Sequence, residues 1–232
     1  MRRILEFGGY AAAVILIGFG VAALVIGING RGEVTDNLKR EKIYGGSDMF
    51  RDGPGSIDEA VAEAGLDPAT ADLPVCEVYD PAKAEADPEY EGESIDTGDE
   101  ARCFAQYMRV HALESSGGLV YAEMGRFLAA DDPTNPAGTS DPAAAVTDEE
   151  GNPVPNAARN TWVTETALAT ALNTAFFATQ VSNFGIVVAI ALILAGIGFG
   201  LLAFAAFHKP FHRARSAAVP PEPPAPPAAP VV

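Results

Sequence analysis

Few side chains in this 232-residue sequence are of the types that do chemistry at enzyme sites. His111 precedes Glu114 by three residues, a spacing that brings two side chains together on one helix face. The histidine could act as a base, but a helix-surface histidine beside a glutamate is most often partly exposed and without a catalytic role. No G-x-S-x-G elbow, glycine-rich phosphate loop or dinucleotide fingerprint is present. We therefore predict no catalytic residue, no cofactor and no enzymatic activity.

A second pair of histidines has the spacing of metal ligands. His208 and His212 lie four residues apart, as paired ligands on a helix do. Pro210 between them disrupts a helix, and Lys209 and Arg213 would repel a cation. The acidic runs of the sequence lack the Asp-x-Asp-x-Asp-Gly frame of a calcium loop, so we interpret them as solvated charge. We predict no metal site.

The two cysteines are the remaining candidates. Cys76 and Cys103 both lie between two long apolar stretches, in a segment that we predict to be exported. A cysteine pair in an oxidising compartment favours one disulfide, which would stabilise the fold by roughly 3–4 kcal/mol on the loop-entropy model. Two free thiols or a metal pair remain as alternatives. A zinc site would need carboxylates, since this segment holds a single histidine.

The elements that must position these residues begin with the two apolar stretches. Residues 7–28 and 184–207 contain no Asp, Glu, Lys, Arg or His, and each is long enough to span a hydrocarbon core of about 30 Å as a helix. A cleaved signal peptide is the alternative for the first stretch. Its apolar run is longer than a usual signal core, and its exit lacks a small-x-small cleavage pattern, so we favour an uncleaved anchor.

The charges predict the orientation. Arg2 and Arg3 precede the first span, and Lys209, Arg213 and Arg215 follow the second, so both termini are expected in the cytoplasm. Segment 31–183 holds 29 of the 31 Asp and Glu residues but ten of the 15 Lys and Arg residues. Such an acidic segment would repel phosphates, which excludes nucleic acid as its partner.

These features predict a mainly α fold in five parts. Two transmembrane helices form an antiparallel hairpin, and a small, helical, loop-rich extracytoplasmic domain lies between them. The parts are a cytoplasmic N-terminus (1–6), the first span (7–28), the acidic domain (29–183), the second span (184–207) and a proline-rich cytoplasmic tail (208–232). Small residues at a spacing of four, which allow close helix packing, are Ala23 with Gly27 and Gly196 with Gly200. They could pack the spans together, mediate self-association, or hold an envelope protein partner.

Within the acidic domain, capping and periodicity predict several elements. The expected helices are 33–42 after a break at Gly30 and Gly32, 56–65, 99–114, and a shorter one at 119–128. Residues 77–99 and 131–156 are expected as loops. A long helix begins at Ala157, with Trp162, Leu168, Leu172, Ala175 and Phe176 along one side. It should continue into the second span, and a kink near Gly185 is left open.

Three stretches carry a resemblance to a known family. They are LKREKI at 38–43, RVHALESSGGLVYAE at 109–123, and the run from Ala157 into the second span. They resemble an actinobacterial family of two-span membrane proteins of unknown function, whose members often carry the label "aromatic ring-opening dioxygenase". Non-haem iron oxygenases typically hold the metal with two histidines and a carboxylate. Here His111 would lie across the membrane from His208 and His212, so the residues do not fit that label.

The sequence therefore favours a non-enzymatic envelope scaffold, sensor or accessory subunit. One alternative is an oligomeric channel or transporter component, because two apolar spans need several copies to form a pore. The other is an extracytoplasmic enzyme or metal-binding module around His111.

Overall fold

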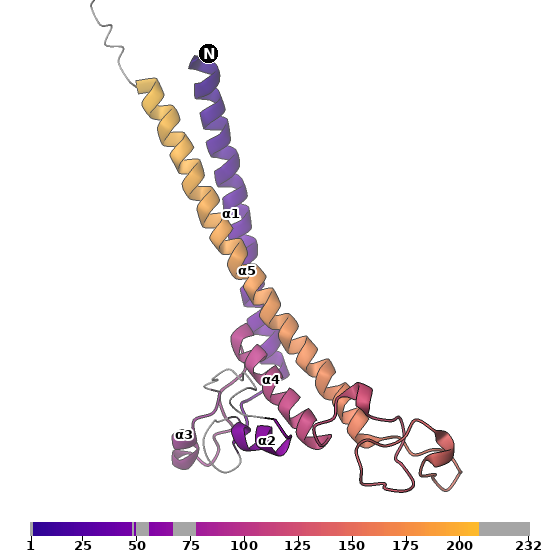
Figure 1. Ribbon diagram of the computed structural model, residues 1–232. Coiled ribbons are helices and arrows are strands. Elements are labelled where there is room, and N and C mark those ends of the chain that lie inside the picture. Colours follow the sequence, from indigo (N-terminus) through magenta and orange to yellow (C-terminus); the bar gives the residue numbers. More distant parts are fainter. Residues whose placement is uncertain (1, 48, 50–55, 67–77, 209–232) are drawn as a thin grey trace, which may run out of the picture.

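The computed structural model describes residues 2–47, 49, 56–66 and 78–208, and the described part is mainly helical, as predicted. Two long helices, α1 (Arg2–Glu41) and α5 (Ala157–His208), lie side by side and run in opposite directions (Figure 1). At one end they carry a polar head, which we define as residues 29–183. The head contains α2 (Ile57–Glu63), α3 (Pro81–Ala86), α4 (Gly98–Ser115) and the 3₁₀ turns η1 (Tyr121–Glu123) and η2 (Pro142–Ala144). The described residues form isolated β-bridges and no strand.

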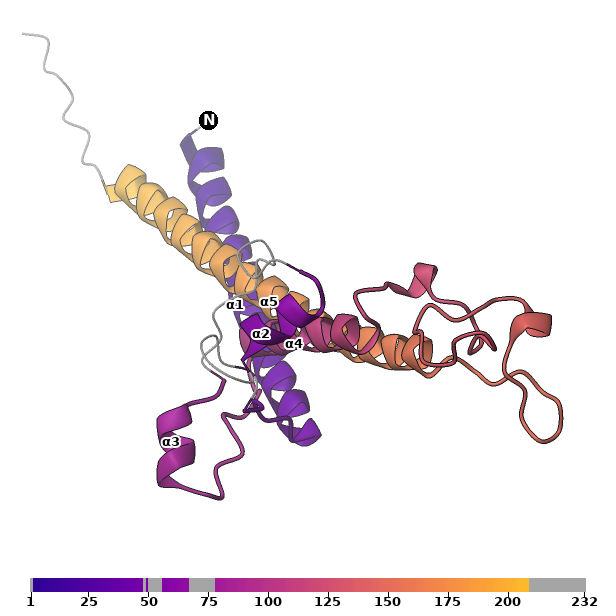
Figure 2. The same ribbon diagram turned by 60° about the horizontal axis from the view of Figure 1, so that its bottom comes forward.

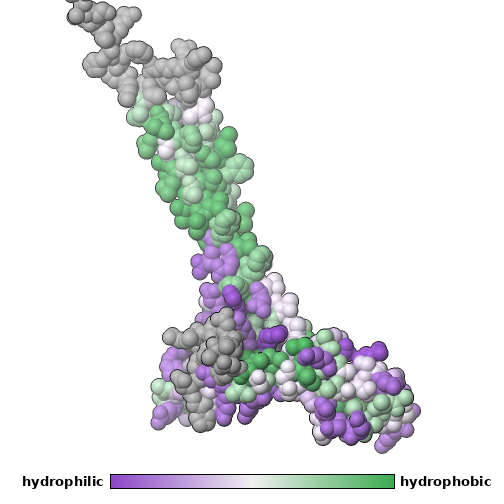
Figure 3. All heavy atoms as spheres, viewed as in Figure 1, coloured by the Kyte–Doolittle hydropathy of each residue, from purple (hydrophilic) through white to green (hydrophobic). Residues whose placement is uncertain are grey.

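The half of the helix pair away from the head is covered with apolar side chains (Figure 3). Phe7 is 76% exposed and Leu202 is 70% exposed, and large apolar side chains point outward all along this half. A core helix of a soluble protein would bury them. Both helices are long and apolar enough to cross a membrane, since 22 residues of helix measure about 33 Å.

Small residues form the contact between α1 and α5. They recur every seven residues and are Ala13, Gly20 and Gly27 on α1 and Ser182, Ala189, Gly196 and Ala203 on α5. A Cβ atom built on Gly20 would lie 2.9 Å from the carbonyl oxygen of Ala189, and one on Gly196 would lie 3.0 Å from that of Ala13. We call this line of close backbone contacts the seam. It runs from Gly9 against Ala203 to Gly30 against Ser182, the whole length of the apolar stretches.

The four small residues singled out in the sequence lie on or near the seam. Gly27 packs against Ser182 and Ile186, and Gly196 packs in the same way on α1. A Cβ atom on Gly200 would lie 3.6 Å from the Cβ of Ala13, while Ala23 is half-buried. Gly27 and Gly196 therefore contact the other helix of the same chain.

The predicted helix break at Gly30 and Gly32 is wrong, because α1 continues to Glu41. A Cβ atom on Gly30 would lie 2.7 Å from the hydroxyl oxygen of Ser182, so this glycine serves close packing and not a turn. Beyond it, Leu38 is buried in the head. Burial of the helix end outweighs the roughly 1 kcal/mol that each helical glycine costs relative to alanine.

The core of the head gathers side chains from both long helices and from α2 and α4. The largest fully buried members are Ile57, Val61, Val78, Ile95 and Tyr107, and they pack with Leu38 of α1 and Leu172 of α5. The head is thus built on the ends of the same two helices that carry the apolar surface. The predicted helix at 56–65 is confirmed, and Ser56 caps it by accepting a hydrogen bond from the Glu59 amide.

The prediction of a short helix at 119–128 is wrong. Its residues form the turn η1 and then an extended segment in which Phe127 bridges to Thr139 and to Pro155. Gly125 lies so close to the Thr139 backbone that an added Cβ atom would clash at 2.3 Å. Pairing with the 131–156 loop, which sequence periodicity does not report, therefore replaces the helix.

The remaining loops are more structured than the sequence suggested. Asn156 is 1% exposed and ties the 125–156 loop to the start of α5. Its amide nitrogen donates to the carbonyl oxygens of Gly125 and Pro136, at 3.1 and 2.8 Å, and its oxygen accepts from the Ala158 amide at 3.1 Å. In the segment 77–99, of which the described part begins at Val78, the short helix α3 interrupts the expected loop. It lies at the opposite end of the head from the 125–156 loop (Figure 2).

Helix α5 is continuous through Gly185. Trp162 and Leu172 are buried, and Ala175 and Phe176 are partly buried, as expected for its inner side. Leu168 is 38% exposed, so its assignment to that side is wrong. Buried and partly buried positions of α5 recur on average every 3.5 residues. Glu165 and Ala169 lie on the side that lines the contact region with α4, and Leu168 does not.

Candidate functional site

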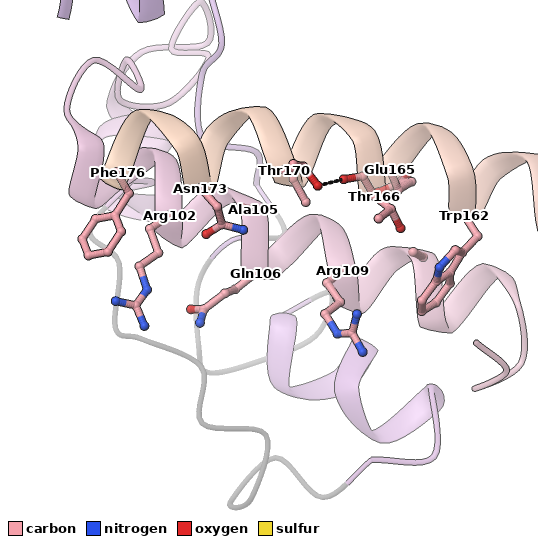
Figure 4. Close-up of a pocket in the computed structure, with 12 residues that line it drawn as sticks. Arg102, Ala105, Gln106, Arg109, Trp162, Glu165, Thr166, Thr170, Asn173 and Phe176 are labelled. Carbon is pink, nitrogen blue, oxygen red and sulfur yellow. Dashed lines mark hydrogen bonds between the residues drawn. The ribbon is translucent and has the colours of Figure 1, made fainter. Parts of the chain in front are cut away.

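In the described part of the head, a groove lies between α4 and α5 (Figure 4), and we call it the α4–α5 groove. Its volume is about 620 Å³. Its lining residues are Arg102, Ala105, Gln106, Arg109 and Ala112 of α4, and Trp162, Glu165, Thr166, Ala169, Thr170, Asn173 and Phe176 of α5. The groove therefore has aromatic rings near both ends and small or polar side chains between them.

Local sequence explains why α4 lies where it does. Thr97 caps the helix by accepting from the Glu100 amide at 3.2 Å, and the Glu100 carboxylate accepts from the Thr97 amide at 2.9 Å. This capping box fixes where α4 begins. Gly98 then allows close contact with α5, since an added Cβ atom would lie 2.4 Å from the Thr179 hydroxyl oxygen. Gly117 and Gly118, both with positive φ, follow its end, so the helix predicted at 99–114 is confirmed.

Two arginines stack on the aromatic rings of the groove. The guanidinium of Arg102 lies 4.7 Å from the ring centre of Phe176, and that of Arg109 lies 5.5 Å from the ring centre of Trp162. In the described part of the chain, neither guanidinium has a carboxylate within ion-pair distance. Their N–H groups therefore remain available, although the head is strongly acidic.

Two polar atoms of the groove are shielded from water and lack a hydrogen-bond partner among the described residues. They are Oε1 of Gln106 and Oε2 of Glu165. Burial raises the pKa of the Glu165 carboxyl, and the charge of nearby His111 acts in the opposite direction. The groove thus combines guanidinium donors with a free amide acceptor and a carboxyl that holds its proton more tightly than usual.

His111 and Glu114 do lie together, as their spacing predicted. Nδ1 of His111 lies 3.2 Å from Oε2 of Glu114, at a partly exposed site on α4. Neither residue lines the groove. Among the residues that the structure describes, His, Cys, Asp and Glu form no group of three or more that could hold a metal ion.

Other sequence candidates fall partly or wholly outside the described residues. Cys103 lies on α4 and is 6% exposed, but Cys76 is outside the described residues, so their disulfide stays a prediction. His208 is the last residue of α5. His212 and the proline-rich tail are outside the described residues.

Comparisons with known proteins do not assign the site. No family model matches the chain, and no curated protein and no solved structure is significantly similar to it. The function is therefore argued from the chain's own residues.

The groove was not found from the sequence, although part of its signal was present. Arg102, Gln106 and Arg109 are four and then three residues apart, which places them on one face of a helix. Their partners on α5 lie more than 50 residues further along the chain. Their meeting depends on the packing of α4 against α5, which a single sequence does not reveal.

Proposed function

We propose that this chain is an integral membrane protein that crosses the bilayer twice, with both termini in the cytoplasm and residues 29–183 outside. Its role is that of a non-enzymatic envelope scaffold or accessory subunit, which presents the head to a partner protein at a fixed height above the bilayer. The observation that carries the proposal is the continuity of α5, which runs unbroken from the apolar half of the molecule into the head.

Continuity gives the head a defined position. The part of α5 from Ala157 to Asn183 extends about 40 Å beyond the second apolar stretch. The groove is formed on this part of the helix, and α1 also enters the core of the head through Leu38. A partner bound to the groove would therefore be held at a fixed distance and rotation relative to the membrane.

The seam supports retention of the first span as a permanent anchor. A signal peptide is cleaved and leaves the protein, whereas α1 contacts α5 from Gly9 to Gly30 and ends in the core of the head. Removing residues 1–28 would expose the Gly196 face of α5 to lipid and leave its close contacts unfilled. The positive residues at both ends of the chain support cytoplasmic termini.

Accessibility labelling in intact cells tests the topology. A membrane-impermeant maleimide is applied with and without prior reduction, and denatured protein serves as the control for reactivity. We expect Cys76 and Cys103 to be labelled after reduction only, which would establish an outside location and a disulfide together. A cysteine introduced at Ser216 should stay unlabelled in intact cells and react after permeabilisation. Labelling of that residue in intact cells would contradict the proposed topology.

Co-purification tests the scaffold role separately. The full-length protein, extracted in a mild detergent, should bring down a stoichiometric partner or a second copy of itself. A monomeric particle with no stoichiometric partner would count against a scaffold or accessory subunit while leaving the topology intact.

A further inference from the structure

We propose that the α4–α5 groove binds a helix of a partner protein that carries two acidic residues seven positions apart. This inference rests on the proposed scaffold role and specifies the chemistry of the partner. It follows from the spacing of the two groove arginines, from the small residues between them, and from the polar atoms that lack partners.

The charges of the groove indicate an acidic occupant. Arg102 and Arg109 line a groove in a head that holds 29 of the chain's 31 acidic residues, yet neither has a carboxylate partner among the described residues. Their stacking on Phe176 and Trp162 restrains both guanidinium groups, and Figure 4 shows that they project from the same side of α4. A guanidinium restrained in this way loses less conformational entropy when it binds a carboxylate.

The spacing of the arginines matches a helix. They lie seven positions apart on α4, which corresponds to about 10 Å along the helix axis and almost two full turns. A partner helix that lies along α4 presents side chains seven positions apart at the same spacing and on one face. An extended peptide places side chains of one face at multiples of about 7 Å and does not match this distance.

The floor of the groove allows a helix to approach. Ala105, Ala112 and Ala169 are small, and Thr166 and Thr170 are exposed on the neighbouring turns of α5. The hydroxyl group of Thr170 is oriented along its own helix, since it donates to the Thr166 carbonyl at 2.7 Å. A helix seated between α4 and α5 would complete a three-helix arrangement with ordinary interaxial distances of 8–10 Å.

Between the two arginines, the groove can recognise a polar residue on the partner. Oε1 of Gln106 is shielded from water and has no hydrogen-bond partner in the described part of the chain. An unsatisfied acceptor of this kind is costly. Gln106 is partly exposed, so rotation of its amide toward the groove would bring Oε1 within reach of a donor such as serine or asparagine on the partner helix. The recognised pattern is then two acids seven apart with a hydrogen-bond donor between them.

A peptide-binding experiment tests this pattern. The full-length protein in lipid nanodiscs is titrated with a labelled, alanine-rich, 21-residue helical peptide that carries glutamates seven positions apart and a serine between them. A peptide of identical composition, with the glutamates on opposite faces, is the comparison. We expect the first peptide to bind roughly tenfold more tightly by fluorescence anisotropy. Equal binding of the two peptides would overturn the proposal.

Matched variants locate the site. The double variant Arg102→Glu with Arg109→Glu should lose the preference for the seven-spaced peptide. Arg126→Glu makes the same charge change as Arg109→Glu alone, at a residue that stacks on Phe127 outside the groove, and should keep the preference. Equal loss with Arg126→Glu would mean nonspecific charge attraction and would overturn the proposal. The milder pair Arg102→Gln with Arg109→Gln, checked by circular dichroism, separates loss of binding from misfolding of α4.

A small anion is the alternative occupant that the same assay excludes. If a linear dicarboxylate about 10 Å long displaces the peptide at the peptide's own concentration, the groove is a small-molecule site and the helix proposal is wrong. Failure of the peptide to bind would refute the groove proposal but leave the cysteine labelling pattern unchanged. The groove proposal and the proposed topology are therefore refuted by different results.

Discussion

Replacing Gly20 with alanine should weaken the contact between α1 and α5. The new Cβ atom would lie 2.6 Å from Cγ1 of Ile193, 2.9 Å from the Ala189 carbonyl oxygen and 3.1 Å from the Ile193 amide nitrogen. The isoleucine side chain can rotate, but the backbone atoms cannot. An ordinary contact needs about 3.4 Å, so the helices must separate by roughly 0.5 Å at this point. Overpacking of this kind costs about 1–3 kcal/mol.

Gly18 provides a matched control on the same helix. A Cβ atom there has no atom within 4 Å, so Gly18→Ala adds no clash and gains up to about 1 kcal/mol of helix propensity. Each variant adds one methyl group to α1, and the two positions are two residues apart. Helix propensity changes equally in both, so their stabilities should differ by the overpacking cost of about 1–3 kcal/mol, with Gly20→Ala the less stable.

The assay follows separation of the two helices directly. The start of α1 and the end of α5 lie at the same end of the molecule (Figure 1), so a donor and an acceptor fluorophore on the chain ends transfer energy while the helices are paired. Titration with SDS from a mild detergent separates the helices and reduces the transfer. A lower midpoint for Gly20→Ala and an unchanged or higher midpoint for Gly18→Ala are expected. Equal midpoints for the two variants would refute the close contact at Gly20.

Three further predictions follow from single contacts. Ala13→Cys combined with Gly200→Cys should form an intramolecular disulfide, because a Cβ atom on Gly200 would lie 3.6 Å from that of Ala13. Mass spectrometry of the digested protein should find this link. The control pair, Gly18→Cys with Gly200→Cys, should form none. Trp162→Ala should destabilise the head by about 3–5 kcal/mol in thermal unfolding, since the indole is 6% exposed and packs in an apolar cluster; an unchanged melting temperature would contradict that burial. Burial raises the pKa of the Glu165 carboxyl, so the contribution of this group to folding stability is fully present below its unfolded pKa and is lost as the pH rises through its folded pKa. Glu165→Gln should therefore raise the melting temperature at pH 7.5 and change it little near pH 4. The reverse order of these two effects would exclude a buried carboxyl.

Much of the fold was predictable from strong local signals. The two apolar stretches, the capped helix near Ser56 and the helix after Thr97 all depend on residues close together in the chain. Gly27 and Gly196 were also recognised as residues that allow close packing. In each case the local pattern and the tertiary contact favour the same conformation.

Two of the wrong predictions share one physical cause, because each concerns a residue whose role depends on a distant part of the chain. Gly30 looks like a helix break, but it is helical because Ser182 packs against it. Gly125 lies in an apparently helical segment, but its backbone contacts Thr139. The groove follows the same rule, since Arg109 becomes part of a site only when Trp162 is folded beside it.

The link between membrane and groove depends on α5 acting as one rigid element. A helix resists bending because each turn is hydrogen-bonded to the next, and α1 packs beside α5 along the apolar half while α4 packs beside it in the head. Gly185, where a kink was conceivable, lies inside the helix between the last head contacts and the first apolar turns, and a Cβ atom there would meet nothing within 4 Å. The neighbouring seam contacts at Ser182 and Ala189 support the helix on both sides of this glycine. A partner bound between Trp162 and Phe176 would therefore move with the proposed membrane spans, so that separating α1 from α5 at the seam would also change how the partner is presented.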